Sequence, residues 1–232
     1  MNFEKAKTTY RKNAVVQKQM AKCLINFLIK NYGKTFDNIF EIGSGTGFLT
    51  DEIRNNLKYK KIILNDITDN FTNFEPDIYL KGDINKIELP LDIDLILSNA
   101  VFQWIEDYEL LFKRLRSILK KDGIIAFSYF GKENFIQIKN ITGIGLEYPN
   151  LDKYIEKEGF KILHFEEELK TLYFKDVHNL LDHIKFTGVK AEDRVWTKKD
   201  YIDFKDKYFE KYKDDNGFEL TYHPLYYTIR AI

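Results

Sequence analysis

The chain has 232 residues, a length that fits one α/β domain with additions. Its 36 basic and 36 acidic residues cancel, so the charge balance disfavours a nucleic-acid-binding role. Hydrophobic residues make up 44% of the chain, which suffices for a substantial core. Cys23 is the single cysteine, which excludes an intramolecular disulfide and favours a reducing compartment.

Two further absences narrow the class of protein. The four histidines form no H-x-x-x-H pair, so we expect no metal site. The N-terminus has no signal-peptide apolar run, and no stretch approaches the roughly 20 apolar residues of a membrane span. These features predict a cytoplasmic protein that does not associate with membranes.

Strand and helix signals alternate through the first half of the chain. Apolar spacing predicts helix over residues 1–32 and again over 108–121, where Gly123 follows as a stop signal. Between and after these helices, short apolar runs predict five strands, at residues 39–42, 61–66, 78–83, 93–98 and 123–129. This alternation predicts a doubly wound, mostly parallel α/β sheet, in which ligands bind beyond the carboxyl ends of the strands.

The pattern changes after residue 130. Helices are predicted at residues 151–159, 176–186 and from 197 onward, where Thr197 and Asp200 suit a capping box. Strands are predicted at 160–165 and 170–174, and residues 218–229 read as one terminal strand interrupted at Pro224. We expect a single domain over 1–232, with an N-terminal helical lid (1–32), a cofactor-binding core (33–130) and a C-terminal half (131–232) whose lid helices span about 175–215.

The run from Asn38 to Phe48 carries the strongest functional signal. A short apolar strand leads into G-x-G-x-G at Gly43, Gly45 and Gly47, and a helix follows. A dinucleotide fingerprint, G-x-G-x-x-G, would require glycine at position 48. Glu41 precedes the first glycine by two residues, where a carboxylate would repel a pyrophosphate but attract the ammonium and sulfonium of S-adenosylmethionine. A glycine-rich turn that closes an ordinary strand–helix unit is the alternative.

Polar residues also end the next three predicted strands. Asp66 lies within the interval at which an acid reaches ribose hydroxyls, and Asp83 could accept from an adenine amino group. Asn99 could hold the methionine end. The alternatives are helix caps for the two aspartates and a turn for the asparagine. The predicted cofactor-binding set is Glu41, Gly43, Ser44, Gly45, Gly47, Asp66, Ile67, Gly82, Asp83, Ile84, Asn99 and Ala100.

With these motifs the chain resembles the malonyl-acyl-carrier-protein O-methyltransferases of biotin synthesis, a class I family. The glycine motif and Asp66 are common to many methyltransferases. The more specific features are four segments that span nearly the whole chain: Phe3 to Tyr10 with Val15 to Ala21, Ser98 to Trp104, Leu181 to Val189, and Leu220 to His223. The chain departs from the family pattern at Glu41, where many relatives have aspartate, and at Pro224, which could reshape the substrate end.

The resemblance implies an S-adenosylmethionine-dependent fold whose last strand is antiparallel. It also implies methylation of the free carboxylate of malonyl-acyl-carrier protein, or of malonyl-coenzyme A, with S-adenosylhomocysteine as product. A carboxylate with a pKa near 4 is already ionised at neutral pH, so we assign no general base. Excluding water and aligning the oxygen with the methyl group then supply the catalysis.

Positioning residues follow from this expectation. Tyr10 and Trp104 are candidate aromatic walls, and Tyr222 and His223 are candidate donors, of which at most one faces the substrate from a strand. The candidate substrate-binding residues are Gln103, Trp104, Lys185, Thr187 and Tyr222. Lysines and an arginine around the lid loop could meet an acidic carrier protein, and these are Lys185, Lys190, Arg194, Lys198 and Lys199.

Two other functions stay open. The enzyme could methylate another small carboxylic acid or small molecule, although an amine or phenol acceptor would need a base and none stands out. A protein of another class, a non-catalytic S-adenosylmethionine-binding regulator, would keep the same glycine turn. The oligomeric state does not follow from the sequence, and we favour a monomer.

Overall fold

A computed structural model describes residues 10–69, 72–187 and 197–232, and contacts divide the chain into two compact units. Among the described residues, the core unit comprises 15–129, 150–167 and 225–232, and the small unit comprises 10–14, 130–149 and 168–224. Both units are therefore assembled from segments that are separated in the sequence. The chain passes between them near residues 14, 130, 149, 168 and 224.

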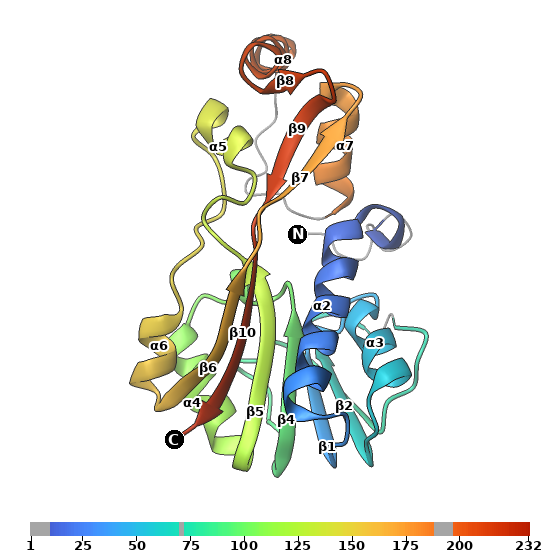
Figure 1. The fold of residues 1–232 in the computed structure, drawn as a ribbon, viewed down its shortest axis with the longest axis vertical. Coiled ribbons are helices and arrows are strands. Elements are labelled where there is room, and N and C mark those ends of the chain that lie inside the picture. The colour runs from blue at the N-terminus through green and yellow to red at the C-terminus, as the bar shows by residue number, and fades with distance from the viewer. Residues whose placement is uncertain (1–9, 70–71, 188–196) are drawn as a thin grey trace. The chain divides into compact units, whose positions relative to one another are not determined.

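The core unit is built on a seven-stranded sheet with the order β3-β2-β1-β4-β5-β10-β6 (Figure 1). Strands β1 to β5 pair in parallel, and β10 pairs antiparallel with β6. This arrangement confirms the predicted doubly wound sheet with an antiparallel last strand. The strands are β1 Asn38–Ile42, β2 Lys61–Asp66, β3 Ile78–Lys81, β4 Ile93–Asn99, β5 Leu119–Phe130, β6 Phe160–Glu167 and β10 Pro224–Ala231.

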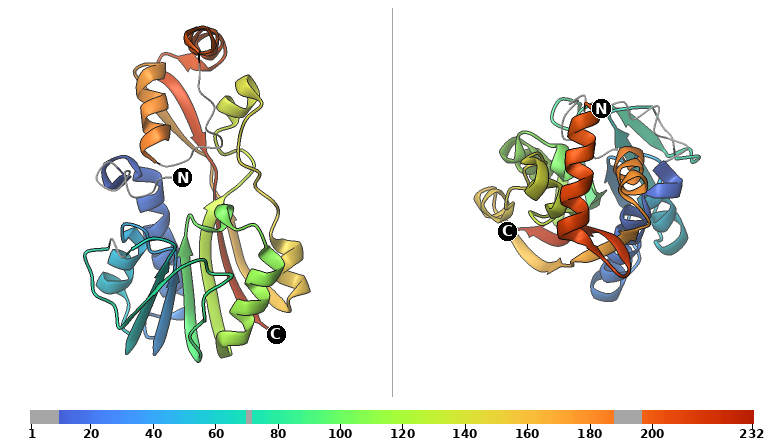
Figure 2. Two further views of the ribbon diagram at one scale, coloured as in Figure 1. Left: turned by 180° about the vertical axis from the view of Figure 1, so that it is seen from behind. Right: turned by 90° about the horizontal axis from the view of Figure 1, so that it is seen from above.

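Helices cover both faces of this sheet (Figures 1 and 2). Helix α2 (Val15–Tyr32) packs beside α3 (Phe48–Asn56), and on the other face α4 (Tyr108–Ile118) packs beside α6 (Asp152–Lys157). Apolar side chains at helical spacing explain the packing, since Val16, Met20, Leu24 and Leu28 of α2 are all buried. A short 3-10 helix, η1 (Phe102–Trp104), follows β4. The central strands bury both faces, which accounts for their continuous apolar runs.

The small unit contains a three-stranded antiparallel sheet with the order β7-β9-β8. Its strands are β7 Lys170–Phe174, β8 Lys213–Asp214 and β9 Gly217–Tyr222, and its helices are α5 Ile136–Thr142, α7 Val177–Phe186 and α8 Lys198–Tyr212. Strand β9 alternates between buried and half-buried residues, as expected of a sheet with one covered face. Helix α8 begins with the predicted capping box between Thr197 and Asp200.

Two sequence-based boundaries are wrong. Helix α4 ends at Ile118, not at residue 121, because β5 already pairs with β4 from Leu119 onward; Gly123 therefore lies inside a strand and caps no helix. The predicted terminal strand is two strands in two sheets. Strand β9 pairs with β7 in the small unit, and β10 pairs with β6 in the core unit. His223, between them, lies in neither strand.

The segments predicted as lids are divided between the units. Helix α2 belongs to the core unit, residues 10–14 belong to the small unit, and residues 1–9 lie outside the described residues. Helices α7 and α8, within the predicted lid of about 175–215, both belong to the small unit. Residues 188–196 of that stretch also lie outside the described residues.

Candidate active site

The polar residues predicted at the strand ends lie along one edge of the core sheet. Ile42 at the end of β1 is level with Asn65 of β2 and with Ser98 of β4. Asp66 in turn is level with Lys81 at the end of β3. The residues that follow these strands are therefore neighbours along a single carboxyl edge. This is the edge at which doubly wound sheets bind ligands, and the strand order reverses there between β1 and β4.

The glycine turn after β1 requires residues without a Cβ atom. Gly43 has φ +70°, and a Cβ there would lie 2.3 Å from Val101 Cγ2. Gly47 has φ +89°, and a Cβ atom at this position would crowd Thr72. The amides of Gly43 and Ser44 both donate to the carbonyl oxygen of Asn65, at 2.8 and 2.9 Å. The turn is thus held against the end of β2, and the missing Cβ atoms would let a ligand approach its backbone closely.

Asn65 organises this edge and was not predicted as a site residue. Its side-chain amide donates to the carbonyl oxygens of Leu80 and Gly82, at 2.8 and 2.9 Å. Its own carbonyl accepts from the glycine turn, so one residue joins the ends of β1, β2 and β3. A buried asparagine within an apolar strand, next to the predicted Asp66, was the sequence signal for this role.

Glu41 is fully buried at the penultimate position of β1. Its Oε2 accepts from the Thr50 hydroxyl at 2.8 Å, whereas Oε1 has no hydrogen-bond partner among the described residues. Burial raises the pKa of this carboxyl from 4.5 to about 8, opposed by the Thr50 hydrogen bond and assisted by Asp66. A buried, incompletely satisfied carboxyl group is costly without a counter-charge. A cationic ligand group at Oε1 would remove that cost.

Asp66 bridges the glycine turn and the loop after β2. Its Oδ2 accepts from the Gly45 amide at 2.8 Å, and its Oδ1 accepts from the amide and hydroxyl of Thr68 at 2.9 and 2.8 Å. The side chain is half-buried, and the following residue, Ile67, is 62% exposed. A carboxylate and an exposed apolar side chain therefore stand together at the end of β2, a combination that suits a nucleoside.

The segment after β3 forms a tight turn. Asp83 accepts from the Asn85 amide at 2.9 Å and pairs with Lys86 at 3.0 Å, and both contacts lower the pKa of its carboxyl. Gly82, at φ +139°, donates its amide to the Asp66 carbonyl oxygen at 2.8 Å. Ile84 is buried in the apolar core. No helix lies among the described residues between β3 and β4, so the alternative that Asp83 caps a helix is wrong. Its contacts are those of a turn, and a role toward adenine stays a prediction.

Asn99, at the end of β4, attaches helix α2 to this edge. Its amide donates to the Gln17 carbonyl oxygen at 3.0 Å, and its Oδ1 accepts from the Ser128 hydroxyl at 2.6 Å. Ala100 follows with φ +55° and donates its amide to the Ser128 carbonyl oxygen. Gln17 is 2% exposed, and its Oε1 has no hydrogen-bond partner among the described residues. Gln17 lies in the family segment Val15 to Ala21, and its sequence position alone gave it no role.

Several buried oxygens thus remain without a hydrogen-bond partner in the described part of the core unit close to this edge. They include Oε1 of Glu41, Gln17 and Gln103; the Gln103 side chain donates to the Ala100 carbonyl at 2.7 Å but leaves Oε1 unsatisfied. Buried polar groups of folded proteins are normally satisfied, so an unpartnered group needs an explanation. Acceptors without donors fit a ligand that carries an ammonium group and hydroxyls, as S-adenosylmethionine does.

A second group of predicted residues lies in the small unit. The Tyr222 hydroxyl is 2.7 Å from His183 Nε2, and both side chains are buried. Burial lowers the pKa of His183 from 6.5 to about 4, so the ring is neutral at pH 7, and burial also raises the pKa of Tyr222. The Thr187 hydroxyl donates to the His183 carbonyl oxygen at 3.0 Å. His183, which received no role from the sequence, therefore holds the hydroxyl of a predicted site residue.

His223 is held by the segment that follows β5. Its Nδ1 accepts from the Glu133 amide at 3.2 Å, which leaves the proton of the neutral ring on Nε2. Its backbone amide donates to Asn134 Oδ1 at 3.3 Å. A Cβ at Gly131 would lie 2.6 Å from His223 Nδ1, so this glycine makes room for the ring. His223 is 5% exposed, and the ring is rigidly placed.

The other predicted positioning residues are less constrained. Trp104 ends η1 and is half-buried, while the core position of that turn is taken by Phe102. Tyr10 is half-buried at the start of a helical turn, and its carbonyl oxygen accepts from the Ala14 amide. Lys185 is exposed near the end of α7, where its ammonium lies 5.9 Å from the Phe186 ring centroid. Tyr10 and Lys185 belong to the small unit and Trp104 to the core unit.

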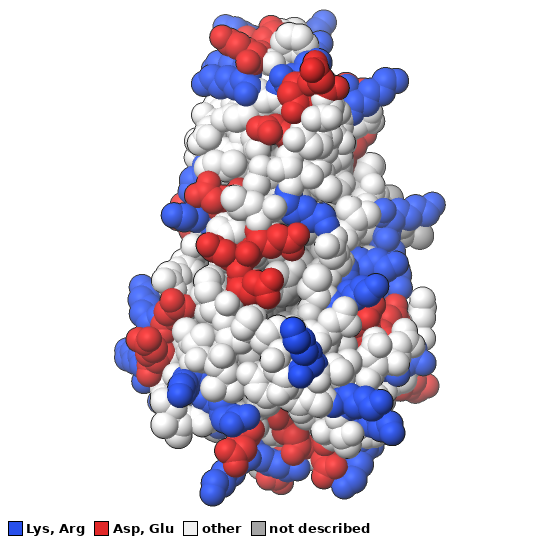
Figure 3. Space-filling view, viewed as in Figure 1, with Lys and Arg blue, Asp and Glu red and all other residues white. Residues whose placement is uncertain are grey.

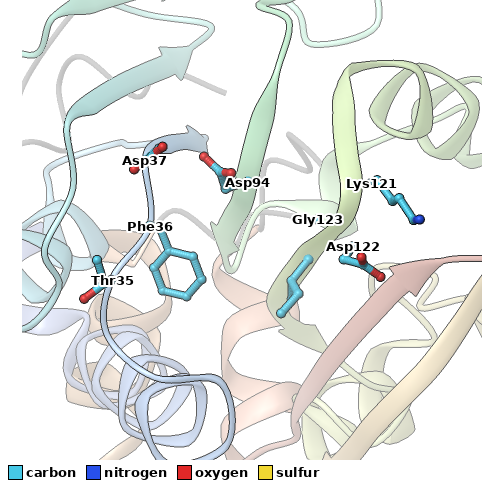
Figure 4. A pocket seen from close by; sticks show the side chains of 8 residues that line it. Thr35, Phe36, Asp37, Asp94, Lys121, Asp122 and Gly123 are labelled. Atoms are coloured by element: carbon cyan, nitrogen blue, oxygen red, sulfur yellow. The ribbon is translucent and has the colours of Figure 1, made fainter.

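The opposite edge of the core sheet carries a shallow pocket (Figure 4). Asp37 and Asp94 line it at the amino ends of β1 and β4, together with Lys121 and Gly123 of β5. Two of its acids are paired, since Asp94 contacts Lys120 at 3.0 Å and Asp37 contacts Lys60 at 3.0 Å. Because the pocket lies at the amino ends of the strands, it is separate from the predicted site at the carboxyl edge.

The described residues lack a metal-binding cluster and a helix that could span a membrane. No group of three or more His, Cys, Asp or Glu side chains there could hold a metal ion. None of the helices in the same part of the chain is both long and apolar enough to cross a bilayer.

Comparison with known proteins agrees with this geometry. A family described as a methyltransferase domain matches residues 40–127, which contain the glycine turn and the ends of β2, β3 and β4. A protein of Burkholderia thailandensis, titled 1,6-didemethyltoxoflavin-N1-methyltransferase and crystallised with S-adenosylhomocysteine, has the same fold. It superposes with a TM-score of 0.55 over 97% of this chain and 84% of that one, at 12% identity.

Closer relatives match the sequence over almost its whole length. A malonyl-[acyl-carrier protein] O-methyltransferase of Calditerrivibrio nitroreducens is 40% identical, covering 98% of this chain and 94% of that protein. One from Bacteroides thetaiotaomicron is 33% identical, covering 97% and 94%. Identity at this level reaches through both units, including the small unit that the domain match omits. The chain therefore belongs to the malonyl-[acyl-carrier protein] O-methyltransferase family.

Proposed function

We propose that this protein transfers a methyl group from S-adenosylmethionine to the free carboxylate of malonyl-acyl-carrier protein, as a step of biotin synthesis. The observation that carries the proposal is the buried, unpartnered Oε1 of Glu41 beside the glycine turn. An acid in that position favours a cationic nucleoside over a pyrophosphate. The names of the full-length relatives supply the substrate.

The core unit would hold the cofactor through residues of the carboxyl edge. Glu41 would accept from the ammonium group, Asp66 would accept from ribose hydroxyls, and Ile67 would cover the adenine. When bound, S-adenosylmethionine supplies an electrophilic methyl group on a positively charged sulfur. The proposed cofactor role of Asp66 competes with its bond to the Gly45 amide, so binding would redistribute hydrogen bonds at the turn.

For methyl transfer, the acceptor carboxylate must be oriented and shielded from water, but it needs no general base. Its oxygen is already anionic near neutral pH, and a strong cation bound to it would weaken the nucleophile. The neutral His183–Tyr222 pair of the small unit suits this requirement, because it can donate a hydrogen bond without supplying a full charge. We propose that Tyr222 or His223, with Tyr10, Trp104, Gln103, Lys185 and Thr187, positions the malonyl group, and that the helices within about 175–215 serve as lid helices of the predicted single domain.

The decisive test supplies purified protein with methyl-labelled S-adenosylmethionine and three acceptors: malonyl-carrier protein, malonyl-coenzyme A and free malonate. We expect label on the carrier-linked malonyl group as a base-labile ester. Label only on free malonate, or on another small acid, would overturn the assignment of substrate. Binding of S-adenosylmethionine without transfer to any acceptor would favour the regulatory alternative.

A further inference from the structure

Helix α2 buries one polar side chain on its apolar side. Gln17 is 2% exposed, and its Oε1 has no hydrogen-bond partner among the described residues. The other buried residues of the helix are all apolar and recur at helical spacing, and they are Val16, Met20, Ala21, Leu24, Ile25 and Leu28. A leucine or methionine at position 17 would pack there without leaving a buried oxygen unsatisfied. Packing therefore does not explain the glutamine, whereas a role toward a ligand would.

The direction of α2 places Gln17 at the carboxyl edge of the core sheet. The helix ends at Tyr32, shortly before β1 begins at Asn38, so its first turn lies toward the carboxyl ends of the parallel strands (Figure 1). The hydrogen bond from Asn99 Nδ2, at the end of β4, to the Gln17 carbonyl oxygen agrees with this placement. Helical side chains lean toward the amino end of their helix, so the side chain of Gln17 leans beyond the end of β4.

Asn99, which was predicted to hold the methionine end of the cofactor, is already engaged within the protein. Its Nδ2 donates to the Gln17 carbonyl oxygen at 3.0 Å, and its Oδ1 accepts from the Ser128 hydroxyl at 2.6 Å. Each end of this carboxamide therefore has a partner, and Asn99 serves to attach α2 to the sheet. The side chain of Gln17 reaches the same end of β4 with its own oxygen unpartnered among the described residues.

The order of the strands indicates which part of the cofactor Gln17 would meet. Asp66 ends β2, Glu41 lies in β1 and Asn99 ends β4, and β1 lies between the other two strands. With the ribose at Asp66, as proposed above, and the adenine on the side of β3, the ligand continues past Glu41 toward the end of β4. Its far end on that side is the α-amino acid of the methionine part, which carries an ammonium group and a carboxylate.

A carboxylate at this edge would meet neutral donors. None of the described lysine and arginine side chains is buried, and Figure 3 shows those of one face, in blue, spread over its surface. A carboxamide suits both charged groups of an amino acid, because its oxygen accepts from the ammonium and its NH₂ group donates to the carboxylate. We propose that Gln17 recognises the α-amino-acid end of S-adenosylmethionine, alongside Glu41. The inference deepens the proposed function and rests on it for the identity of the cofactor.

Two nucleosides distinguish this role from a general effect on the site. S-adenosylhomocysteine carries the amino-acid end, and methylthioadenosine lacks it. We expect Gln17→Met, which keeps the length of the side chain, to weaken binding of S-adenosylhomocysteine about tenfold and binding of methylthioadenosine by less than about twofold. Asp66→Ala should weaken both. Gln19→Met, the same change at an exposed position of α2, should weaken neither. Calorimetry with each nucleoside measures the affinities of the wild type and the three variants.

Thermal stability shows whether a loss of affinity comes from binding or from folding. Gln17→Met removes an unsatisfied buried oxygen, so the thermal midpoint of unfolding should stay equal or rise. Gln17→Ala leaves a cavity, and its midpoint should fall. Both variants should nevertheless show the same selective loss of S-adenosylhomocysteine binding. A selectivity shared by two variants that differ in stability does not come from unfolding.

Equal weakening of both nucleosides by Gln17→Met, or unchanged binding of S-adenosylhomocysteine, would overturn the inference. The assay with malonyl acceptors tests the proposed function separately. If the wild type transfers no methyl group to any of them while Gln17→Met still loses S-adenosylhomocysteine selectively, the inference stands and the proposed function fails. If transfer occurs and Gln17→Met binds both nucleosides like Gln19→Met, the proposed function stands and the inference fails.

Discussion

The carboxyl edge of the core unit and the His183–Tyr222 group of the small unit are built in different ways. At the edge, the polar residues lie at or just beside the ends of strands, and parallel register alone makes the residues neighbours. In the small unit, the bonded atoms come from residues that are 39 positions apart in one pair and 90 in another. The comparison teaches that a site made at strand ends is visible in local sequence, whereas a site made by packing is not.

The two regions also differ in how completely their buried polar atoms are satisfied. Glu41 leaves one carboxyl oxygen without a partner among the described residues, whereas His183 and Tyr222 satisfy each other. The edge therefore has spare hydrogen-bonding capacity for a ligand. The pair in the small unit has less, because one of its two polar protons is used in the mutual hydrogen bond and one is left to donate. Changes at the edge should act first on cofactor affinity, and changes in the small unit on substrate and stability.

The largest effect is expected from Gly43→Ala. The new Cβ would lie 2.3 Å from Val101 Cγ2 at a backbone with φ +70°, so strain and overpacking should together cost about 2–5 kcal/mol of unfolding free energy. Cofactor binding, followed by calorimetry, should be lost. Gly33→Ala is the matched control, because its φ is +82° but no atom lies within 4 Å of a Cβ. It should cost about 1 kcal/mol and leave cofactor binding intact. Equal behaviour of the two variants would refute the steric account.

Asp66→Ala should have the next largest effect. Loss of charge-assisted hydrogen bonds to the ribose should weaken cofactor binding by about 1–3 kcal/mol, measured by calorimetry with S-adenosylhomocysteine. Asp69→Ala is the control, since Asp69 pairs with Lys81 on the surface nearby. Unchanged affinity in Asp66→Ala would rule out its ribose role.

Tyr222→Phe should destabilise the protein by about 1–2 kcal/mol, because it leaves the buried Nε2 of His183 without its partner. Cofactor affinity should not change, while the KM for the malonyl substrate should rise. Urea unfolding and calorimetry on the same preparation test both halves of this expectation. A drop in cofactor affinity comparable to that of Asp66→Ala would erase the functional distinction between the two regions.

The smallest expected effect is a dependence of the unfolding free energy on pH. The pKa of Glu41 rises from 4.5 to about 8 on folding, so the folded state binds more protons in that window and stability falls as pH rises through it. His183 has the opposite sign: its pKa falls from 6.5 to about 4, so its contribution to stability is lost as pH drops through that range. The two oppose each other between pH 4.5 and 6.5.

Above pH 6.5 the contribution of His183 no longer changes, and Glu41 alone of the two makes stability depend on pH. Stability should fall from about pH 6.5 to 8 with a slope of at most about 1.4 kcal/mol per pH unit. Denaturant midpoints across this range measure the slope, and Glu41→Gln should flatten it. A slope that survives in Glu41→Gln would mean that another group is responsible. Because a cationic ligand favours the ionised carboxyl, cofactor binding should release protons in the same range, which calorimetry in buffers of different ionisation enthalpy detects.

Local patterns in the sequence determined the parallel sheet, the glycine turn and the order of polar residues along the carboxyl edge. Apolar runs, turn residues and helix caps act over a few neighbouring positions, so they can be predicted from the sequence alone. The capping box at Thr197 and Asp200 is predicted for the same reason. Asp66 and Asn99 could be located as strand-end residues, but their partners, the Gly45 amide and the Gln17 carbonyl, could not.

Tertiary structure alone decided how distant segments were combined. Residues 218–229 were predicted as one interrupted strand, yet β9 and β10 belong to different sheets, because each finds its partner strand elsewhere in the chain. The early end of α4 likewise follows from pairing between β5 and β4. His183 became a partner of Tyr222 only when α7 packed on β9. Such contacts depend on side chains far apart in sequence, for which local spacing carries no information.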